Sequence, residues 1–92
     1  MATLTATEIR AALAAVPQWR KRGAIIARTY EFADFVAAMK FVNAVARRAE
    51  QAGHHPDIDI RWNRVTLALT THDAGGLTAK DFALAQACDR LI

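Results

Sequence analysis

Three histidines carry the chemistry that this sequence can perform. His54 and His55 are adjacent, and His72 follows them at a distance that can bring it back to the pair. Imidazole has an unperturbed pKa close to neutrality, so histidines that converge on one pocket can exchange protons at physiological pH without large pKa shifts. The sequence therefore predicts proton-transfer chemistry at a site built from these residues.

Polar and aromatic residues accompany the histidines. Glu50 lies one helical turn before the pair, where it could orient an imidazole, bind a polar ligand or face solvent. Asp81 follows Thr78 by three positions, which fits a helix capping box, and the same carboxylate could also serve the site. Trp62 is interpreted mainly as a core residue, and a binding role is the less favoured hypothesis.

A zinc site is the competing functional interpretation, because neutral imidazole is a common zinc ligand. Adjacent residues such as His54 and His55 seldom direct both side chains at one ion, and no helical pair of histidines or nearby cysteine completes a ligand set. The single cysteine, Cys88, is expected to be a small buried apolar residue. Gly75 and Gly76 alone indicate a turn and not a phosphate loop. We expect no metal and find no support for nucleotide chemistry.

Capping signals mark the first and last helices. Thr5 and Glu8 fit a capping box that starts a helix, and Pro17 favours an extended residue before it and so ends that helix. Thr78 and Asp81 start the last helix in the same way. Both helices carry apolar residues at helical spacing and should pack on a sheet.

The longest helix should deliver the histidine pair. Asp34 is a suitable N-cap, and Gly53 can take the left-handed conformation that ends a helix. Pro56 prevents continuation, so His54 and His55 occupy a turn between helix and strand. The apolar stripe expected to face the sheet consists of Phe35, Met39, Val42, Val45 or Ala46, and Ala49.

A hairpin should return the chain to the histidines. Residues 57–62 and 65–72 alternate between apolar and polar side chains and are joined by Asn63-Arg64. A two-residue turn at that link would place His55 opposite His72, so that two histidines meet across the hairpin. The other pairs of this register are Trp62 with Val65, Ile60 with Leu67, and Ile58 with Leu69.

One further strand completes the sheet. Residues 24–32 are rich in branched and aromatic side chains, and a short extra strand is expected near Trp19. Helices segregated to one face of an antiparallel sheet make an α+β two-layer sandwich. We predict a single domain over residues 1–92, with an antiparallel sheet of about four strands and three helices packed on one face.

Net charge, alanine content and hydropathy limit the classes of partner that this chain can have. The net charge is +3, but basic residues cluster only at 20–22 and 47–48 with few aromatics between them, so we expect solvated surface and no direct nucleic-acid binding. Much of the apolar content is alanine, which buries little area per residue, so the core favours a homo-oligomer. Residues 1–5 lack a signal-peptide pattern and no stretch approaches a membrane span. A cytoplasmic protein is therefore expected.

The spaced positions match a known family. A charged residue, a His-His-Pro triplet, an aromatic, a histidine and an aspartate recur in order at Glu50, His54, His55, Pro56, Trp62, His72 and Asp81. The sequence resembles the pterin-4a-carbinolamine dehydratase (4a-hydroxytetrahydrobiopterin dehydratase) family over nearly its whole length. Further features of the resemblance are Leu4-Thr5 through Glu8, Pro17 with Trp19, Tyr30-Glu31-Phe32, Asp34-Phe35, and Thr71-His72-Asp73 with Gly76-Leu77.

The resemblance implies a hydro-lyase that converts 4a-hydroxytetrahydropterin to quinonoid dihydropterin and water, the recycling step after aromatic amino-acid hydroxylation. It implies that His54 and His72 are the acid-base pair and that His55 mainly holds the substrate. Asp81 and Glu50 would support the site, together with Pro56 and Trp62 of the signature. No redox cofactor is required.

The resemblance also implies an alternative, because some members of this family act without catalysis. Animal members bind a homeodomain transcription factor as dimerisation partners, and divergent plant and bacterial relatives assist assembly of a carbon-fixing enzyme. Family members form homodimers or homotetramers. The complete signature favours the enzyme over a binding partner or assembly factor.

Overall fold

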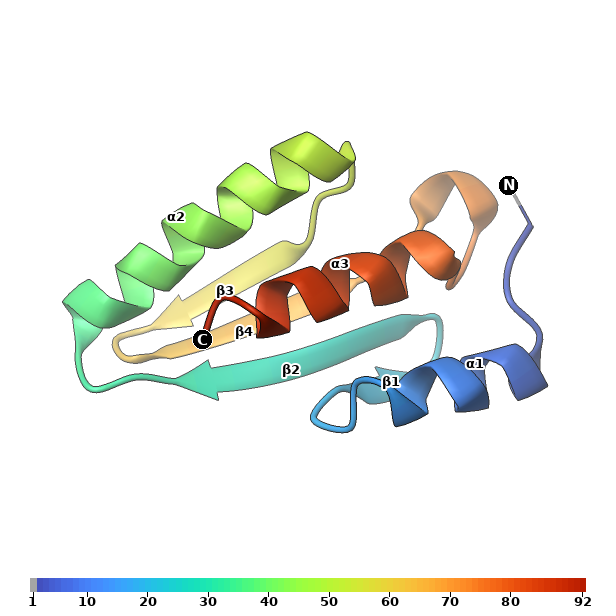
Figure 1. Cartoon of the computed structure of the whole chain (residues 1–92), viewed down its shortest axis with the longest axis horizontal. Coiled ribbons are helices and arrows are strands. Elements are labelled where there is room, and N and C mark those ends of the chain that lie inside the picture. Colours follow the sequence, from blue (N-terminus) through green and yellow to red (C-terminus); the bar gives the residue numbers. More distant parts are fainter. Residues whose placement is uncertain (1) are drawn as a thin grey trace.

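The computed structural model describes residues 2–92; Met1, which the expected domain of residues 1–92 includes, lies outside the described residues. Figure 1 shows the helices and strands in the predicted order, with a short 3₁₀ helix in addition. The elements are α1 (Ala6–Ala14), β1 (Arg20–Arg22), β2 (Ile25–Glu31), α2 (Phe35–Ala52), β3 (Asp57–Arg61), β4 (Arg64–Leu69), η1 (His72–Ala74) and α3 (Ala79–Asp89).

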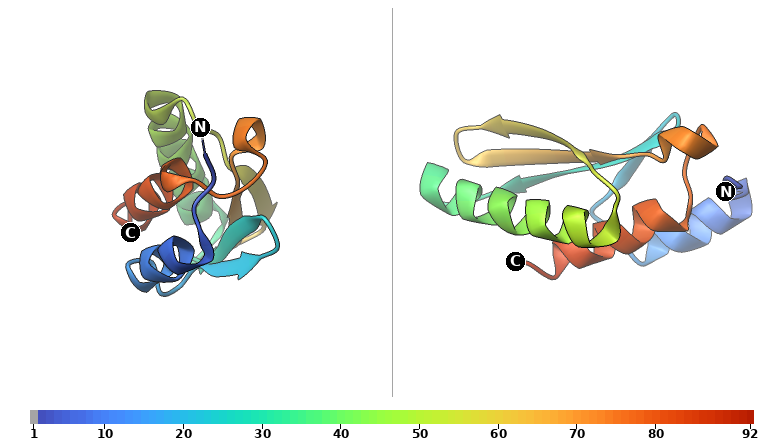
Figure 2. Two further views of the ribbon diagram at one scale, coloured as in Figure 1. Left: turned by 90° about the vertical axis from the view of Figure 1, so that its right-hand side faces the viewer. Right: turned by 90° about the horizontal axis from the view of Figure 1, so that it is seen from above.

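The strands form one antiparallel sheet in the order β1-β2-β4-β3. The three α-helices cover one of its faces, as the view from above in Figure 2 shows, and leave the other face open. The predicted α+β two-layer sandwich is therefore confirmed, including the short extra strand after Trp19. Within residues 2–92, no helix has the length and apolar character needed to cross a membrane.

The predicted helix ends are confirmed where local chemistry determines them. Thr5 and Glu8 form a reciprocal capping box at α1, and Asp34 accepts a hydrogen bond from the backbone N–H of Ala37 at α2. Gly53 ends α2 with φ 61°, in the left-handed region that glycine adopts at low steric cost. This turn changes the chain direction just before the histidine pair.

The predicted apolar stripe of α2 is partly wrong. Its buried residues are Ala38, Phe41, Val45 and Ala49, whereas Phe35 is 47% exposed. The predicted and observed stripes have the same helical period and differ by one position in the first half of the helix. The packing of Phe41 explains which stripe faces the sheet. The centroid of its ring lies 4.5 Å from that of Tyr30 and 5.1 Å from that of Phe32.

The predicted hairpin register is wrong by two residues. Arg61 pairs with Arg64, so Trp62 and Asn63 form the turn. The backbone N–H of Phe32 donates to the Asn63 carbonyl at 2.9 Å, and the Asn63 side-chain amide donates to the Phe32 carbonyl at 2.8 Å. These bonds to the end of β2 fix the turn at this position. The observed pairs include Ile60 with Val65 and Ile58 with Leu67.

The register change separates the two histidines that the sequence pairs directly. The β3–β4 ladder begins at Asp57 and Ala68, so His55 does not pair with His72. The β4 strand also ends at Leu69, and His72 starts η1 instead of continuing the strand. A two-residue shift preserves the alternation of faces, so Val65 and Leu67 still face the core.

A half-buried carboxylate ties the end of α3 to the sheet. Asp89 accepts hydrogen bonds from the Trp19 indole at 3.0 Å and from the Tyr30 hydroxyl, and pairs with Arg28 at 2.8 Å. Burial, followed by the hydrogen bond to Asp89, raises the pKa of Tyr30 well above its usual range. Cys88 is fully buried, as predicted, and burial raises its pKa to about 11.

Candidate active site

The three histidines line one small cavity where the end of α2, η1 and the start of α3 meet. Gly53 turns the chain out of α2 before the histidine pair, and His72 reaches the same cavity from η1. The cavity measures about 220 Å³. It is lined by Gly53, His54, His55, Thr70, Thr71, His72, Asp73 and Lys80. The predicted convergence of the histidines is therefore present, although it arises from η1 and not from a strand register.

A buried carboxylate holds one of the histidines. The Nε2 atom of His54 lies 2.6 Å from Oδ1 of Asp81, and the side chains are 11% and 0% exposed. Oδ2 of Asp81 accepts from the Thr71 hydroxyl at 2.8 Å and from the Thr78 backbone N–H at 2.9 Å. Both oxygens of this carboxylate are therefore occupied by protein donors.

This network fixes the tautomer of His54. An ionised carboxylate can only accept hydrogen bonds, so the proton between Asp81 and His54 belongs to Nε2. The Thr71 hydroxyl donates its one proton to Asp81, and the neighbouring Thr78 hydroxyl, 2.8 Å from it, must then donate to Thr71. In the neutral imidazole Nδ1 is left as the acceptor, which is the form a general base requires.

The second histidine has a carboxylate partner in a very different setting. Nε2 of His55 lies 2.5 Å from Oε2 of Glu50 in the last turn of α2. Their side chains are 62% and 77% exposed. Solvent competes for both groups, so this pair orients His55 only weakly.

Backbone hydrogen bonds position His72. The carbonyl of Thr71 accepts from the backbone N–H groups of Ala74, Gly75 and Gly76, which closes the tight turn of η1. Thr71 also donates its backbone N–H to the Gly76 carbonyl at 3.1 Å. The same residue therefore supports His72 through its backbone and His54 through its side chain and Asp81.

The match to known proteins covers nearly the whole chain. The family model described as pterin 4 alpha carbinolamine dehydratase matches residues 2–91. The chain belongs to this family. Relatives in Acidobacterium capsulatum and Chloroflexus aurantiacus, which carry the provisional name pterin-4-alpha-carbinolamine dehydratase, are each 59% identical over 92 residues. The alignment spans 100% of this chain and 100% and 99% of theirs.

Two solved structures resemble this member of the dehydratase family. A transcriptional coactivator/pterin dehydratase from Brucella melitensis superposes with a TM-score of 0.93 at 34% identity, over 97% of each chain. A pterin dehydratase-like protein described as a RuBisCO assembly factor in the alpha-carboxysome superposes with a TM-score of 0.69 at 25% identity. That match covers 80% of this chain and 88% of the other.

Four residues of the dehydratase signature do not line the cavity. Asp81 and Glu50 hydrogen-bond to histidines that line it, whereas Trp62 and Pro56 do not. Trp62 is 64% exposed in the β3–β4 turn, not in the core as predicted. The length of β3, about 17 Å at 3.4 Å per residue, separates it from the histidine pair. Pro56 connects His55 to β3 and is not among the cavity-lining residues. The cavity therefore forms without either side chain.

Sequence reasoning missed Thr71 and Lys80 as residues of this cavity. Thr71 continues the alternation of buried residues in β4, at Val65, Leu67 and Leu69, and is 6% exposed. A polar side chain at a buried position needs a partner, and this was the signal available in the sequence. Lys80 gave no comparable signal, because it stands beside Asp81 on the exposed side of the helix start.

Among residues 2–92, no group of three or more His, Cys, Asp or Glu side chains is arranged to hold a metal ion. Nε2 of both His54 and His55 faces a carboxylate of the protein. The arrangement offers one imidazole with a fixed tautomer and two exposed imidazoles on the rim of the same cavity. These groups can donate and accept protons around a small polar ligand.

Proposed function

We propose that this chain catalyses the dehydration of 4a-hydroxytetrahydropterin to quinonoid dihydropterin and water by histidine acid-base catalysis. The observation that carries this proposal is the hydrogen bond between His54 and the buried Asp81, in a cavity shared with His55 and His72. Membership of the dehydratase family supports the substrate class.

The reaction needs one proton donor and one proton acceptor. Hydroxide is a poor leaving group from C4a unless it is protonated, and loss of the N5 proton allows the C4a–N5 double bond to form. We assign the base to His54, because its Nε2–H is committed to Asp81 and Nδ1 is the remaining acceptor. We assign the acid to His72, which lines the same cavity and is exposed.

The protons then balance. His72 gives a proton to the departing hydroxyl, which leaves as water, and His54 takes the proton from N5. Solvent returns His72 to its protonated form and removes the proton from His54. His55, on the rim beside Glu50, holds the substrate. The step belongs to tetrahydropterin recycling, and the reaction that consumes this cofactor is aromatic amino-acid hydroxylation.

The test is the dehydration rate of enzymatically generated 4a-hydroxytetrahydropterin. Wild type should accelerate the spontaneous reaction, and His54→Ala and His72→Ala should each lose most of that acceleration while retaining the fold by circular dichroism. Arg47→Gln is a matched control on the exposed side of α2 and should keep the wild-type rate. A folded wild type that gives no acceleration would overturn the proposal.

We also propose that a second copy of this chain pairs with the free edge of β3. This strand lies at the sheet edge, and its Ile58 and Ile60 are 37% and 39% exposed. Exposed apolar edge strands pair readily with another chain because their backbone groups have no partner on that side. Antiparallel pairing of two β3 strands would join two sheets and cover both isoleucines.

Sedimentation equilibrium tests this pairing. Wild type should form at least a dimer, and Ile60→Lys should dissociate this dimer because it places a charge in the β3–β3 interface. Val36→Lys, at an exposed apolar position of α2, should leave the dimer intact. Dissociation by Val36→Lys alone would move the interface to the helix, and a monomeric wild type would contradict self-association.

A second candidate function is a binding or assembly role without catalysis. Support comes from the 25% identical structure, which is described as a RuBisCO assembly factor. The exposed apolar side chains of β3 and α2 would serve such a role, and the histidines would not be needed. The dehydration assay separates the candidates, because only the enzyme requires His54 and His72.

A further inference from the structure

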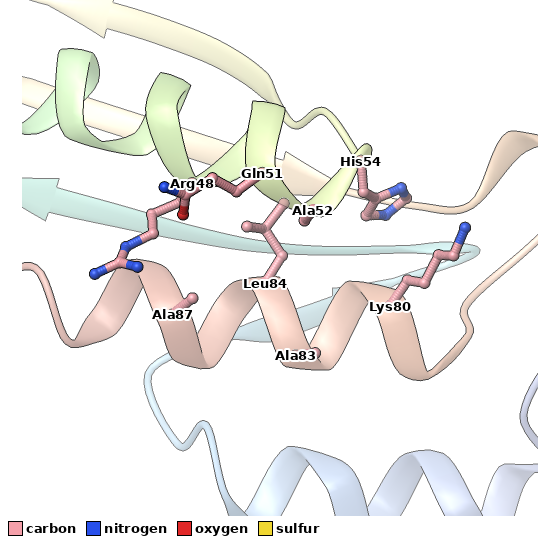
Figure 3. A pocket seen from close by; sticks show the side chains of 8 residues that line it. All are labelled: Arg48, Gln51, Ala52, His54, Lys80, Ala83, Leu84 and Ala87. Carbon is pink, nitrogen blue, oxygen red and sulfur yellow. The ribbon is translucent and has the colours of Figure 1, made fainter.

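A second, larger groove lies between α2 and α3, next to the histidine cavity. It measures about 400 Å³. Figure 3 shows His54 and Lys80 at one end and Arg48 at the other, above Ala87. His54 and Lys80 also line the histidine cavity, so the two spaces share a wall. The groove therefore adjoins the place where a ligand of the histidines would lie.

The groove has an apolar middle and cationic ends. Ala52, Ala83 and Leu84 line the middle, between Lys80 and Arg48, and Gln51 adds one uncharged amide side chain. No acidic side chain lines it among the described residues. Neither Arg48 nor Lys80 forms an ion pair within residues 2–92. Charge complementarity therefore favours an anionic occupant with an apolar spacer.

The helix gives the length of that spacer. The groove follows α3 from Lys80 to Ala87, which is about 10 Å at a rise of 1.5 Å per residue. An occupant that starts at the histidines and reaches Arg48 must therefore carry a side chain of about this length.

We propose that the α2–α3 groove is a subsite for the substrate's side chain and that it selects pterins whose side chain ends in an anionic group. This inference rests on the proposed dehydratase function and names the substrate class within it. The pterin ring lies against the histidines, the spacer packs on the alanines and Leu84, and the terminal carboxylate or phosphate pairs with Arg48.

Affinity measurements with unreactive oxidised pterins test the subsite. Three ligands share one ring and one spacer of about 10 Å and end in a carboxylate, a phosphate or a neutral amide. Wild type should bind the carboxylate ligand about fivefold more tightly than the amide, since an exposed charge pair contributes modestly. A preference confined to the phosphate ligand would identify phosphate as the terminal group.

Arg48→Gln should reduce this preference to less than twofold, and Arg47→Gln, one residue away and outside the groove, should retain it. Ala83→Leu fills the middle of the groove and should weaken every long ligand about fivefold while leaving the bare pterin unaffected. Ala46→Leu, at an exposed position of α2 outside the groove, is its control.

The outcomes separate the subsite from the proposed function. Equal affinity of wild type for charged and neutral ligands, or a preference that survives Arg48→Gln, would overturn the subsite and leave the dehydratase standing. Failure to bind any pterin, together with an absent dehydration rate, would instead overturn the dehydratase.

Discussion

Two neighbouring histidines of this protein each pair with a carboxylate. The N···O distances of the two pairs are similar, but their exposure to solvent differs strongly. His54 lies 2.6 Å from Asp81, and His55 lies 2.5 Å from Glu50. The first pair is 11% and 0% exposed, and the second is 62% and 77% exposed. The interaction energies of the two pairs therefore differ despite their similar distances, because water and salt compete with the exposed pair and not with the buried one.

The partners of each carboxylate explain the difference. Asp81 also accepts from the Thr71 hydroxyl and the Thr78 backbone, which hold it in place before any ligand arrives. Glu50 sits in the last turn of a helix and faces solvent. The buried pair can therefore fix a tautomer, whereas the exposed pair can adapt its geometry to a ligand.

Asp81→Asn should have the largest effect, because it removes the charge that makes Nε2 of His54 a donor. We expect kcat to fall on the order of 10²-fold or more, by analogy with other histidine–carboxylate pairs. The free energy of unfolding should fall by about 3 kcal/mol, because the buried network loses its charge. Rate measurements and urea unfolding give both values.

Asp57→Asn is the matched control for this substitution, since Asp57 is exposed at the start of β3 and does not line the cavity. It should change the rate by less than about twofold and the free energy of unfolding by less than about 0.5 kcal/mol. Equal losses in the two variants would mean that net charge, and not the buried pair, matters.

Thr71→Val should have an intermediate effect, because Thr71 positions Asp81 without touching the reacting atoms. Loss of its hydroxyl should lower kcat about tenfold and stability by about 1–2 kcal/mol. Thr71→Ser keeps the hydroxyl and should restore most of the rate. ¹⁵N shifts of the His54 ring report the tautomer, and an unchanged Nε2–H tautomer in Thr71→Val would argue against a positioning role.

Glu50→Gln should have the smallest effect. We expect stability to change by less than about 0.5 kcal/mol and kcat by less than about threefold, with the remaining change disappearing at high salt. KM is the parameter to follow, because His55 is assigned to substrate holding. A loss of kcat as large as that of Asp81→Asn would abolish the distinction between the two pairs.

The sequence predicts well those features that depend on neighbouring residues. The capping pairs Thr5–Glu8 and Thr78–Asp81 and the left-handed turn at Gly53 all follow from interactions within a few positions. They also explain why the fold class and the turn that carries the histidine pair could be predicted.

The missed features depend on contacts between distant segments. Alternation is unchanged by a two-residue shift, so the hairpin pattern could not reveal that Asn63 bonds to Phe32 and moves the turn. Helical period likewise could not show that Phe41 packs on Tyr30. Thr71 joins the site through Asp81, ten positions away, and no local pattern gives that distance in space.

The anchoring of α3 by Asp89 gives the protein a spectroscopic reporter. The two tryptophans differ sharply, since Trp19 is 3% exposed with its indole hydrogen-bonded to Asp89, and Trp62 is 64% exposed in the hairpin turn. In a Trp62→Phe background, intrinsic fluorescence would come from Trp19 alone. Its emission would shift to the red when the last turn of α3 leaves the sheet. The C-terminal turn of the helix that carries Asp81 can thus be followed by the fluorescence of Trp19.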